Sequence, residues 1–289
     1  MSRFLAHSLH PEDIVFVFRA YNIYYLSTKK IKALLGQSNQ LVVDFDESDY
    51  LSLGTFGDKI PHWPLVKQLI LEREQLLLSM PHITYFVSGK NESDNIKAHY
   101  RSVAQIRVLP NKLALKPIIH QRSLSTPLRL LLIGTYTYEP NLDMIQDLLD
   151  NLLPDLSAPG AYEFHVVGRG LPNALIEQLK SFSGVIVHGS LSDFALEALY
   201  QTIHLNLTLV RFGGGTKYKL VEALAYGIPI VATAASVEGL HIKPMKHYIP
   251  VTSHSFKESM GLLTQENYRQ MQLDCRSVYE QHYFFQRIE

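Results

Sequence analysis

The chain has almost no cysteine, no excess charge of either sign and no long apolar run. Cys275 is its only cysteine, which excludes an intrachain disulfide and agrees with a reducing compartment. Lysine plus arginine and aspartate plus glutamate each number 27, so no basic field argues for nucleic acid as a partner. The apolar runs are too short for a transmembrane segment, and the first residues lack the apolar core of a secretory signal. We expect a cytoplasmic protein, with peripheral attachment to a membrane left open.

What is present is an alternation of strand and helix patterns over 289 residues, enough for two α/β domains. In the first half, such alternation predicts βαβ units and a parallel sheet. The expected strands are 13–18, 41–46, 83–88 and 106–110, and the expected helices are 24–35, 65–80 and 92–100. A polar, glycine-bearing loop is expected up to about Trp63. The proline-containing segment 112–127 is predicted to connect the domains.

The second half repeats the alternation more clearly and predicts a five-stranded doubly wound sheet. In such sheets ligands bind at the carboxyl ends of the strands, so four loops are expected to open on one edge. The expected strands are 128–134, 162–168, 185–188, 205–209 and 228–233, separated by helices at 141–153, 173–181, 193–201 and after a glycine run.

That glycine run is the most informative motif. Three glycines and a threonine at 213–216 lead into a helical pattern that carries Lys217, Lys219 and Glu222. A helix N-terminus presents unpaired N–H groups and a positive dipole end, which suit a phosphate. Helical side chains lean toward the N-terminus, so the Glu222 carboxylate could accept hydrogen bonds from hydroxyls attached to that phosphate. A diphosphate that carries a ribose fits this layout.

Residues 128–240 resemble the donor-binding domain of GT-B glycosyltransferases of the large retaining family 4, also called group 1. The resemblance rests on the order and spacing of four motifs: Leu132-Ile133-Gly134 followed by Glu139-Pro140-Asn141; Val166-Val167-Gly168-Arg169-Gly170; Val187-His188-Gly189-Ser190-Leu191-Ser192-Asp193; and Gly213 to Thr233, trailed by Glu238-Gly239-Leu240. The first half is similar only to the latter part of the family's acceptor domain, at 13–19, 42–46, 87–89 and 108–111.

The resemblance implies two Rossmann-like doubly wound parallel-sheet domains, the first one truncated. The implied division is a partial acceptor-side domain (1–115), a linker (116–127), a donor-binding domain (128–268) and a terminal helix that crosses back to the first domain (269–289). The implied reaction moves a sugar, with retention, from a nucleotide-sugar to a glycan, lipid-linked or small acceptor. Polysaccharide assembly is the usual setting, and no metal or other cofactor is expected.

Site roles follow from the same resemblance. Glu222 would bind the ribose, and Arg169 or Lys219 would neutralise the diphosphate, so these three are the catalytic candidates. The loop at 188–191 would cradle the base through backbone groups. The implied donor-binding residues are Gly134, Thr135, His188, Gly189, Ser190, Leu191, Gly213, Gly214, Gly215, Thr216, Lys217 and Glu222.

Two departures from the family pattern support an alternative. Gly214 stands where the family usually carries a second glutamate on the donor sugar, and the first domain begins at what looks like its middle. The alternative is a non-catalytic glycosyltransferase-like subunit that binds nucleotide or a partner chain, which would complete the first domain. An epimerase on this fold is less favoured because no carboxylate–histidine acid/base pair is apparent.

The same side chains are also compatible with ordinary structural roles. Glu222 could pair with Lys219, Arg169 could be a loop arginine, and His188 could be structural. The loop 135–138 could reach the sugar or cover the sheet, and the leucine-rich 65–80 is better explained by core packing than by a membrane surface. The acidic cluster Asp44, Asp46, Glu47 and Asp49 could bind metal or acceptor, but a solvated loop with helix-capping roles is favoured.

Overall fold

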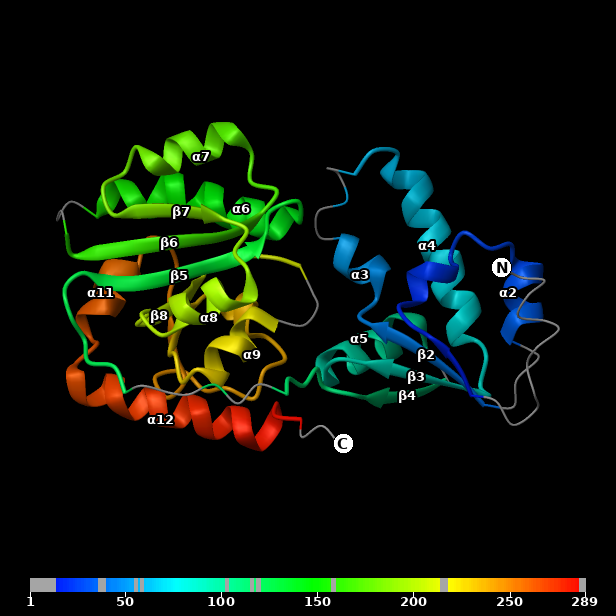
Figure 1. Ribbon diagram of the computed structural model, residues 1–289. Helices are drawn as coiled ribbons and strands as arrows, with labels where there is room; N and C mark the ends of the chain where they lie inside the picture. The colour runs from blue at the N-terminus through cyan, green and yellow to red at the C-terminus, as the bar shows by residue number, and fades with distance from the viewer. Residues whose placement is uncertain are drawn as a thin grey trace. The chain divides into compact units, whose positions relative to one another are not determined.

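The computed structural model describes residues 14–35, 40–54, 57, 60–101, 104–114, 117, 121–156, 160–213 and 218–285. The chain divides into two compact units, 1–111 with 213–216 and 112–212 with 217–289 (Figure 1). Each unit is built on its own parallel sheet with helices between the strands. The predicted α/β fold class is therefore confirmed.

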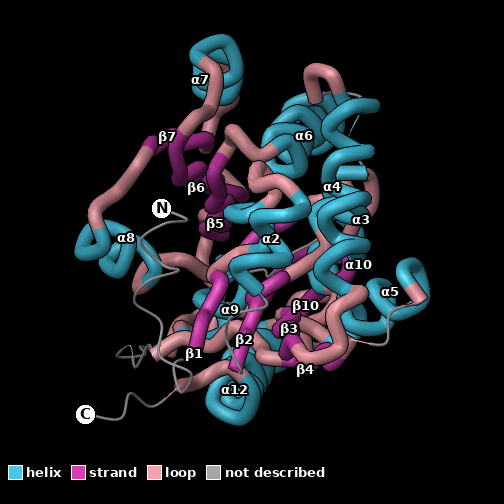
Figure 2. The backbone as a smooth tube through the Cα atoms, turned by 90° about the vertical axis from the view of Figure 1, so that its right-hand side faces the viewer, coloured by secondary structure: helices cyan, strands magenta, loops and turns pink. Residues whose placement is uncertain are grey.

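The first unit contains four parallel strands in the order β1-β2-β3-β4, which lie side by side in Figure 2. All four were expected from the sequence. Between them the described residues form a 3₁₀ turn and four helices, of which α3 lies in the stretch predicted to be a loop. The elements are β1 (Ile14–Val17), η1 (Ala20–Ile23), α2 (Thr28–Leu35), β2 (Gln40–Asp46), α3 (Asp49–Gly54), α4 (Trp63–Leu78), β3 (Ile83–Val87), α5 (Lys90–Tyr100) and β4 (Gln105–Val108).

The order of these strands winds in one direction, so right-handed crossovers bring the helices to the same face. The buried cluster of this unit accordingly joins alternate strand residues, such as Val43 and Tyr85, to Ile70 of α4 and other helix residues. The opposite face carries Ile14 and Phe16, whose side chains are 64% and 53% exposed. Among the described residues, the core of the first unit thus lies on one face of its sheet.

Where the structure describes it, the second unit contains six parallel strands in the order β10-β9-β8-β5-β6-β7. The sequence predicted five, and the sixth, β10, was missed because it has three residues, lies at the sheet edge and ends in proline. The elements are β5 (Leu128–Thr135), α6 (Glu139–Asp147), the π turn η3 (Leu148–Leu152), η4 (Leu153–Asp155), β6 (Tyr162–Arg169), α7 (Asn173–Lys180), β7 (Val185–Gly189), α8 (Asp193–Tyr200), β8 (Leu205–Thr208), α9 (Tyr218–Ala225), β9 (Ile230–Ala232), α10 (Ala234–Val237), β10 (Tyr248–Pro250), α11 (Phe256–Gly261) and α12 (Gln265–His282).

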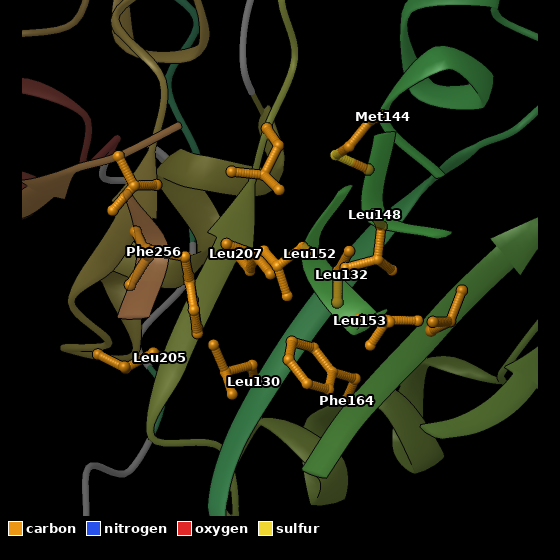
Figure 3. Close-up of a cluster of buried hydrophobic side chains, with 14 of the residues drawn as sticks. Leu130, Leu132, Met144, Leu148, Leu152, Leu153, Phe164, Leu205, Leu207 and Phe256 are labelled. Carbon is orange, nitrogen blue, oxygen red and sulfur yellow. The ribbon is translucent and has the colours of Figure 1, made fainter. Parts of the chain in front are cut away.

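Apolar side chains cover both faces of this second sheet, as its near-continuous apolar strands predict. On one face, Leu130, Leu132 and Phe164 of β5 and β6 pack against Leu148 and other residues of the α6 segment (Figure 3). On the other face, strand residues such as Leu131 pack with α8, α9 and α12. The order reverses between β5 and β8, so the unit is doubly wound around that junction.

Arg122, within the predicted linker, is built into the second unit. Its side chain is 7% exposed, and its guanidinium donates hydrogen bonds to the carbonyl oxygens of Tyr200, Gln201 and Tyr226 at 3.1, 3.4 and 3.2 Å. These carbonyls lie at the C-terminal ends of α8 and α9, where helix dipoles favour a cation. Gln272 of α12 pairs with the Arg122 backbone.

Candidate functional site

The candidate site lies where the strand order of the second sheet reverses. The loop after β5 leads into α6 on one face, and the loop after β8 leads toward α9 on the other. Loops that diverge in this way leave a crevice at the carboxyl ends of the strands, which is where ligands bind in doubly wound sheets. The predicted residues Gly134, Thr135, Lys219 and Glu222 all belong to these two segments or to α9.

The Lys219 side chain reaches the end of β5. Its Nζ donates to Oδ1 of Asn141 at 2.9 Å, and Nδ2 of Asn141 donates to the carbonyl oxygen of Thr135 at 3.0 Å. A Cβ at Gly134 would lie 3.0 Å from Cγ of Asn141. The structure therefore brings three predicted residues together around one amide that the sequence did not mark as functional.

The loops after β5 and β6 also touch one another. Gly168 has a φ of 139°, and a Cβ there would lie 1.8 Å from the carbonyl oxygen of Gly134, so only glycine fits. Tyr136 is buried between them, with its hydroxyl 3.2 Å from the carbonyl oxygen of Val167 that accepts its hydrogen bond. Within the loop 135–138, the Tyr136 side chain thus covers the sheet, and it also lines a hollow beside these loops.

A hollow of about 270 Å³ lies beside these loops, at the ends of β6 and β7. Three predicted residues line it, namely Arg169, Gly189 and Ser190, together with Gly168 and other residues. Arg169 is exposed, so its guanidinium can turn toward an anion at the edge of the sheet. Leu191 follows these residues and packs against the core on the α9 side.

Glu222 is paired with Tyr200, the last residue of α8. The Tyr200 hydroxyl donates to Oε2 of Glu222 at 3.1 Å, and the Tyr200 ring stacks on Tyr226 with centroids 4.4 Å apart. Burial raises the pKa of Glu222, against the lowering effect of the Tyr200 hydrogen bond. The carboxylate is thereby held on α9 by a neighbour that the sequence reading had not identified.

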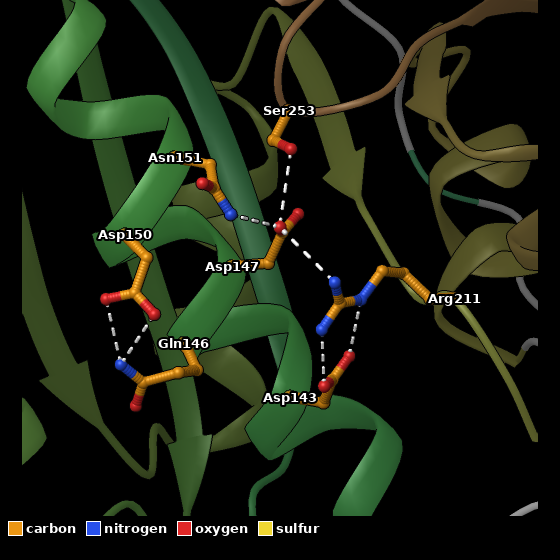
Figure 4. Close-up of polar contacts among 7 residues, drawn as sticks. All are labelled: Asp143, Gln146, Asp147, Asp150, Asn151, Arg211 and Ser253. Carbon is orange, nitrogen blue, oxygen red and sulfur yellow. Dashed lines mark hydrogen bonds and ion pairs between the residues drawn. The ribbon is translucent and has the colours of Figure 1, made fainter.

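A cluster of charged residues fixes Arg211, which lies two positions before the glycine run. Arg211 makes two hydrogen bonds to the Asp143 carboxylate, with Nε at 2.9 Å and NH2 at 2.6 Å (Figure 4). It also lies 3.7 Å from Oδ1 of Asp147, which accepts a hydrogen bond from Asn151 at 2.8 Å. Asp143 and Asp147 belong to α6, as does Asn141. Helix α6 therefore contacts the chain both before the glycine run, at Arg211, and after it, at Lys219.

His188 contributes to a small polar network between β6 and β7. Its Nε2 lies 2.9 Å from Nδ1 of His165, the two rings are stacked, and His165 in turn lies 2.8 Å from the Glu163 carboxylate. Burial lowers the pKa of both histidines. This pairing supports a structural role for the His188 side chain. The part of the 188–191 loop that is then left for contact with a ligand is its backbone.

The centre of the glycine run lies outside the described residues. Gly214, Gly215, Thr216 and Lys217 therefore stay predictions. Gly213 is described and has a φ of 96°, a conformation that favours glycine.

The acidic cluster of the first unit is not the solvated loop that the sequence favoured. Asp46 is 6% exposed, forms an ion pair with Arg19 and accepts a hydrogen bond from Asn111 at 3.2 Å. Burial and the neighbouring carboxylates raise the pKa of Glu47 and of Asp49 to about 7. The correction follows from α3, which folds the residues after β2 back onto the unit. In the described part of the chain, no group of three or more potential ligands could hold a metal ion.

Sequence reasoning missed four side chains of these contacts: Asn141, Asp143, Tyr200 and Arg211. Asn141 lies inside one of the quoted motifs, and Arg211 lies directly before the glycine run, so position alone could have drawn attention to both. Tyr200 and Asp143 lie on amphipathic helices and carry no local signal. Their partners are far along the chain and become visible only in the fold.

Residues 127–253 match the family described as "Glycosyl transferases group 1". No curated protein sequence matches the chain. Among solved structures, a sucrose-phosphate synthase from Thermosynechococcus elongatus is 14% identical with a TM-score of 0.72, covering 98% of this chain and 72% of that one. A UDP-forming α,α-trehalose-phosphate synthase from Burkholderia xenovorans is 9% identical with a TM-score of 0.66, covering 98% and 73%. A chain of a GtfA/B complex is 15% identical with a TM-score of 0.63, covering 98% and 56%.

At these identities the structural likeness establishes the fold, which is GT-B with two Rossmann-like units. The match to the group 1 glycosyl transferases lies within the second unit, at residues 127–253, where the motifs carry the resemblance. The matched family is one of enzymes that transfer sugars. Among the described residues, no helix is long and apolar enough to cross a membrane.

Proposed function

We propose that this chain transfers a sugar from a nucleotide-sugar donor to a glycan, lipid-linked or small acceptor, with retention of configuration. The observation that carries the proposal is the Lys219 ammonium at the carboxyl end of β5, 2.9 Å from Asn141 Oδ1. This position lies at the reversal point of a sheet whose family transfers sugars. An ammonium there suits the diphosphate of a nucleotide-sugar.

In the proposed reaction, the bond between the anomeric carbon and the diphosphate oxygen breaks, and a bond to an acceptor hydroxyl oxygen forms. The hydroxyl proton leaves toward the departing diphosphate. Negative charge grows on that diphosphate, so cations and oriented N–H groups nearby lower the barrier. Lys219 and Arg169 are the proposed cations, and the glycine run and the backbone of 134–135 are the proposed N–H donors. The base would occupy the hollow beside Gly189 and Ser190.

Glu222 is proposed to hold the ribose. Its Oε2 accepts from Tyr200, and the carboxylate has further acceptor capacity for ribose hydroxyls. Glu222→Ala should weaken binding of the preferred nucleotide by about 1–3 kcal/mol, since buried hydroxyl donors lose a charged acceptor. Calorimetry with the nucleoside diphosphate measures this, and Tyr200→Phe, which keeps the ring, is the matched control with a smaller expected loss. Unchanged nucleotide affinity in the Glu222→Ala variant would show that Glu222 does not bind the ribose.

The first test is thermal unfolding of the protein with UDP, GDP, ADP, CDP or dTDP. Ligand at a hundred times its Kd should stabilise the fold by roughly 2.7 kcal/mol. UDP comes first because one structural neighbour is a UDP-forming enzyme. A nucleotide that raises the midpoint identifies the base, and release of that nucleoside diphosphate from its sugars only when acceptor is added then supports transfer. We also propose that no metal is required, so EDTA should leave nucleotide affinity unchanged.

A non-catalytic subunit is the second candidate, and two observations favour it. The described core of the first unit lies on one face of its sheet, and one neighbour is a chain from a two-component complex of which this chain covers 56%. A subunit of this kind would bind nucleotide or a partner chain without turnover. Stable co-purification with a second glycosyltransferase-like chain, together with no nucleoside diphosphate release in its absence, would favour this candidate over the transferase.

A further inference from the structure

A β-bulge interrupts the pairing of β6 and β7 directly beside the hollow that is proposed to hold the base. Val166 and Val167 are consecutive residues of β6, but they lie opposite Val187 and Gly189 of β7. His188 is therefore one residue extra in its strand, which makes it the bulged residue. Bulges bend a strand and turn the residues that follow, and they are common next to active sites.

Gly189 follows the bulge in a conformation that favours glycine. Its φ is 68°, in the left-handed region. A Cβ at this position would meet no atom within 4 Å apart from its neighbours in the chain, so the backbone angle and not a lack of space calls for glycine. Gly189 and Ser190 line the hollow, so the bulge decides which way their backbone groups face.

The bulged residue is held by the side chain of His165 on the neighbouring strand. His165 is 6% exposed, its Nδ1 lies 2.9 Å from Nε2 of His188, and the two rings stack with centroids 5.2 Å apart. Side chains of adjacent strand residues point to opposite faces of a sheet, and Val166 lines the hollow. His165 therefore lies on the face away from the hollow, where it can hold His188 without touching a ligand.

The protons of this histidine pair can be assigned from its surroundings. Burial lowers the pKa of both histidines below the usual 6.5, so both rings are neutral at pH 7. Among the described residues, the charged groups that act on the pair are Glu163 of β6 and Arg129 of β5, and Oε1 of Glu163 lies 2.8 Å from Nε2 of His165. A carboxylate oxygen at this distance favours a proton on that nitrogen, although the N–H is not aligned with it as a hydrogen bond. Nδ1 of His165 is then the acceptor, and Nε2 of His188 donates to it.

We propose that His165 is a positioning residue for the 188–191 loop: it accepts a hydrogen bond from the bulged His188 and so fixes the backbone of Gly189 and Ser190 at the hollow. This inference rests on the proposed function, because that function places the base in the hollow. His165 itself makes no contact with the ligand. Changes at position 165 should therefore act through His188, and on ligands that carry a base but not on those that carry only phosphate.

The test compares His165→Leu with His165→Asn at pH 7.5. Leucine removes the acceptor, whereas the amide oxygen of asparagine can take the place of Nδ1. Calorimetry with UDP, uridine and inorganic pyrophosphate, or with the matching nucleotide and nucleoside if the unfolding panel identifies another base, separates the base from the phosphates. We expect His165→Leu to weaken binding of UDP and uridine about tenfold, the effect of roughly one hydrogen bond, and to leave pyrophosphate binding unchanged. His165→Asn should restore most of the affinity.

His188→Leu removes the same hydrogen bond from its donor side and should cause the same loss. The double variant with leucine at both positions should lose no more than either single variant, because both changes break one interaction. His204→Gln is the matched control, since His204 is a buried histidine of the same unit that directly precedes β8, at the opposite end of the strands from the hollow. It should leave all three affinities unchanged.

The outcomes separate this inference from the function on which it rests. Equal losses for UDP and pyrophosphate, or equal losses in His165→Leu and His165→Asn, would show a merely structural role and overturn the inference. Unchanged uridine affinity in both leucine variants would overturn it as well, with nucleotide binding by the wild type intact. Failure of the wild type to bind any nucleoside diphosphate would instead overturn the proposed function and the inference together. If His165→Leu does not fold, the half-buried His188 provides the same test, with His188→Leu compared to His188→Gln, whose amide can still donate.

Discussion

The two units bury charges of opposite sign. In the first, Glu74 is 0% exposed and accepts hydrogen bonds from the Tyr24 and Tyr100 hydroxyls at 3.1 and 2.5 Å, from Ser48 at 2.6 Å and from the Tyr50 N–H at 3.1 Å. In the second, the buried Arg122 donates to helix carbonyl oxygens. Each charged side chain accepts or donates hydrogen bonds within its own unit. These hydrogen bonds offset the free-energy cost of removing the charge from water.

The two units also contain groups that respond to pH in opposite ways. Burial raises the pKa of Glu47 and Asp49 in the first unit and lowers the pKa of His165, His204 and other histidines in the second. The comparison can be measured because each unit holds a unique probe. The only tryptophan, Trp63, is in the first core, and the only cysteine, Cys275, is fully buried in the second.

The largest effect is expected from Arg122→Ala. It leaves three carbonyl oxygens at the ends of α8 and α9 without their donor, and we expect a loss of about 3 kcal/mol from the stability of the second unit. Denaturant titration followed by Cys275 thiol reactivity measures the loss, with Trp63 fluorescence as the internal reference. Arg122→Lys is the control and should recover part of the stability. Equal displacement of both probes would show that the units unfold together and would break the comparison.

A smaller effect of the opposite sign is expected from Glu47→Gln. The ordinary pKa of 4.5 rises to about 7 in the folded protein, because of burial and the nearby Glu92 and Asp46. The folded state thus holds this proton more tightly, so its contribution is complete below pH 4.5 and is lost as pH rises toward 7. The amide removes that loss, and we expect about 1–2 kcal/mol of added stability at pH 8 after allowance for solvent screening. Trp63 fluorescence in denaturant at pH 5 and pH 8 would detect it, and a gain of equal size at both pH values would contradict this explanation.

The smallest effect concerns His204 in the second unit. Its Nδ1 accepts from the Arg129 N–H at 2.9 Å, and burial together with Arg129 and Arg122 lowers its pKa below 6.5, against a weaker opposite effect of Glu163. The unfolded chain takes up the proton first, so this stability is present above pH 6.5 and is lost as pH falls. In the His204→Gln variant, the glutamine oxygen can accept the same hydrogen bond. The Cys275 thiol should then lose less of its protection from reaction as the pH falls. An unchanged pH profile would assign that sensitivity to the other histidines.

The periodicity of apolar residues was enough to predict nearly every strand and helix. The exceptions are short elements: β10 is three residues long and contains Pro250, α10 has four residues, and α3 and α11 have six residues each. Such segments gain their structure from the neighbours on which they lie, and a local pattern does not contain that information.

The candidate site could be predicted only in part. A glycine run and a following lysine are local signals, so the segment around Lys219 was found. The partners of those residues were not, because the contact between Asn141 and Lys219 depends on which strands become neighbours at the reversal of the sheet. Where a side chain points is decided by the fold, and two residues 78 positions apart give no common pattern.

The close approach of Gly134 to Asn141 also limits the order in which substitutions can accumulate. A methyl group at position 134 would press on the Asn141 amide, with contacts of 3.0 Å. Alanine at 134 is therefore expected to be costly while asparagine remains at 141 and to become cheap once a smaller residue has replaced it. The reverse path, from alanine back to glycine, meets no such barrier. A lineage that has lost the amide at position 141 can thus replace the glycine at position 134. Asparagine can then return at 141 only after glycine has been restored at 134.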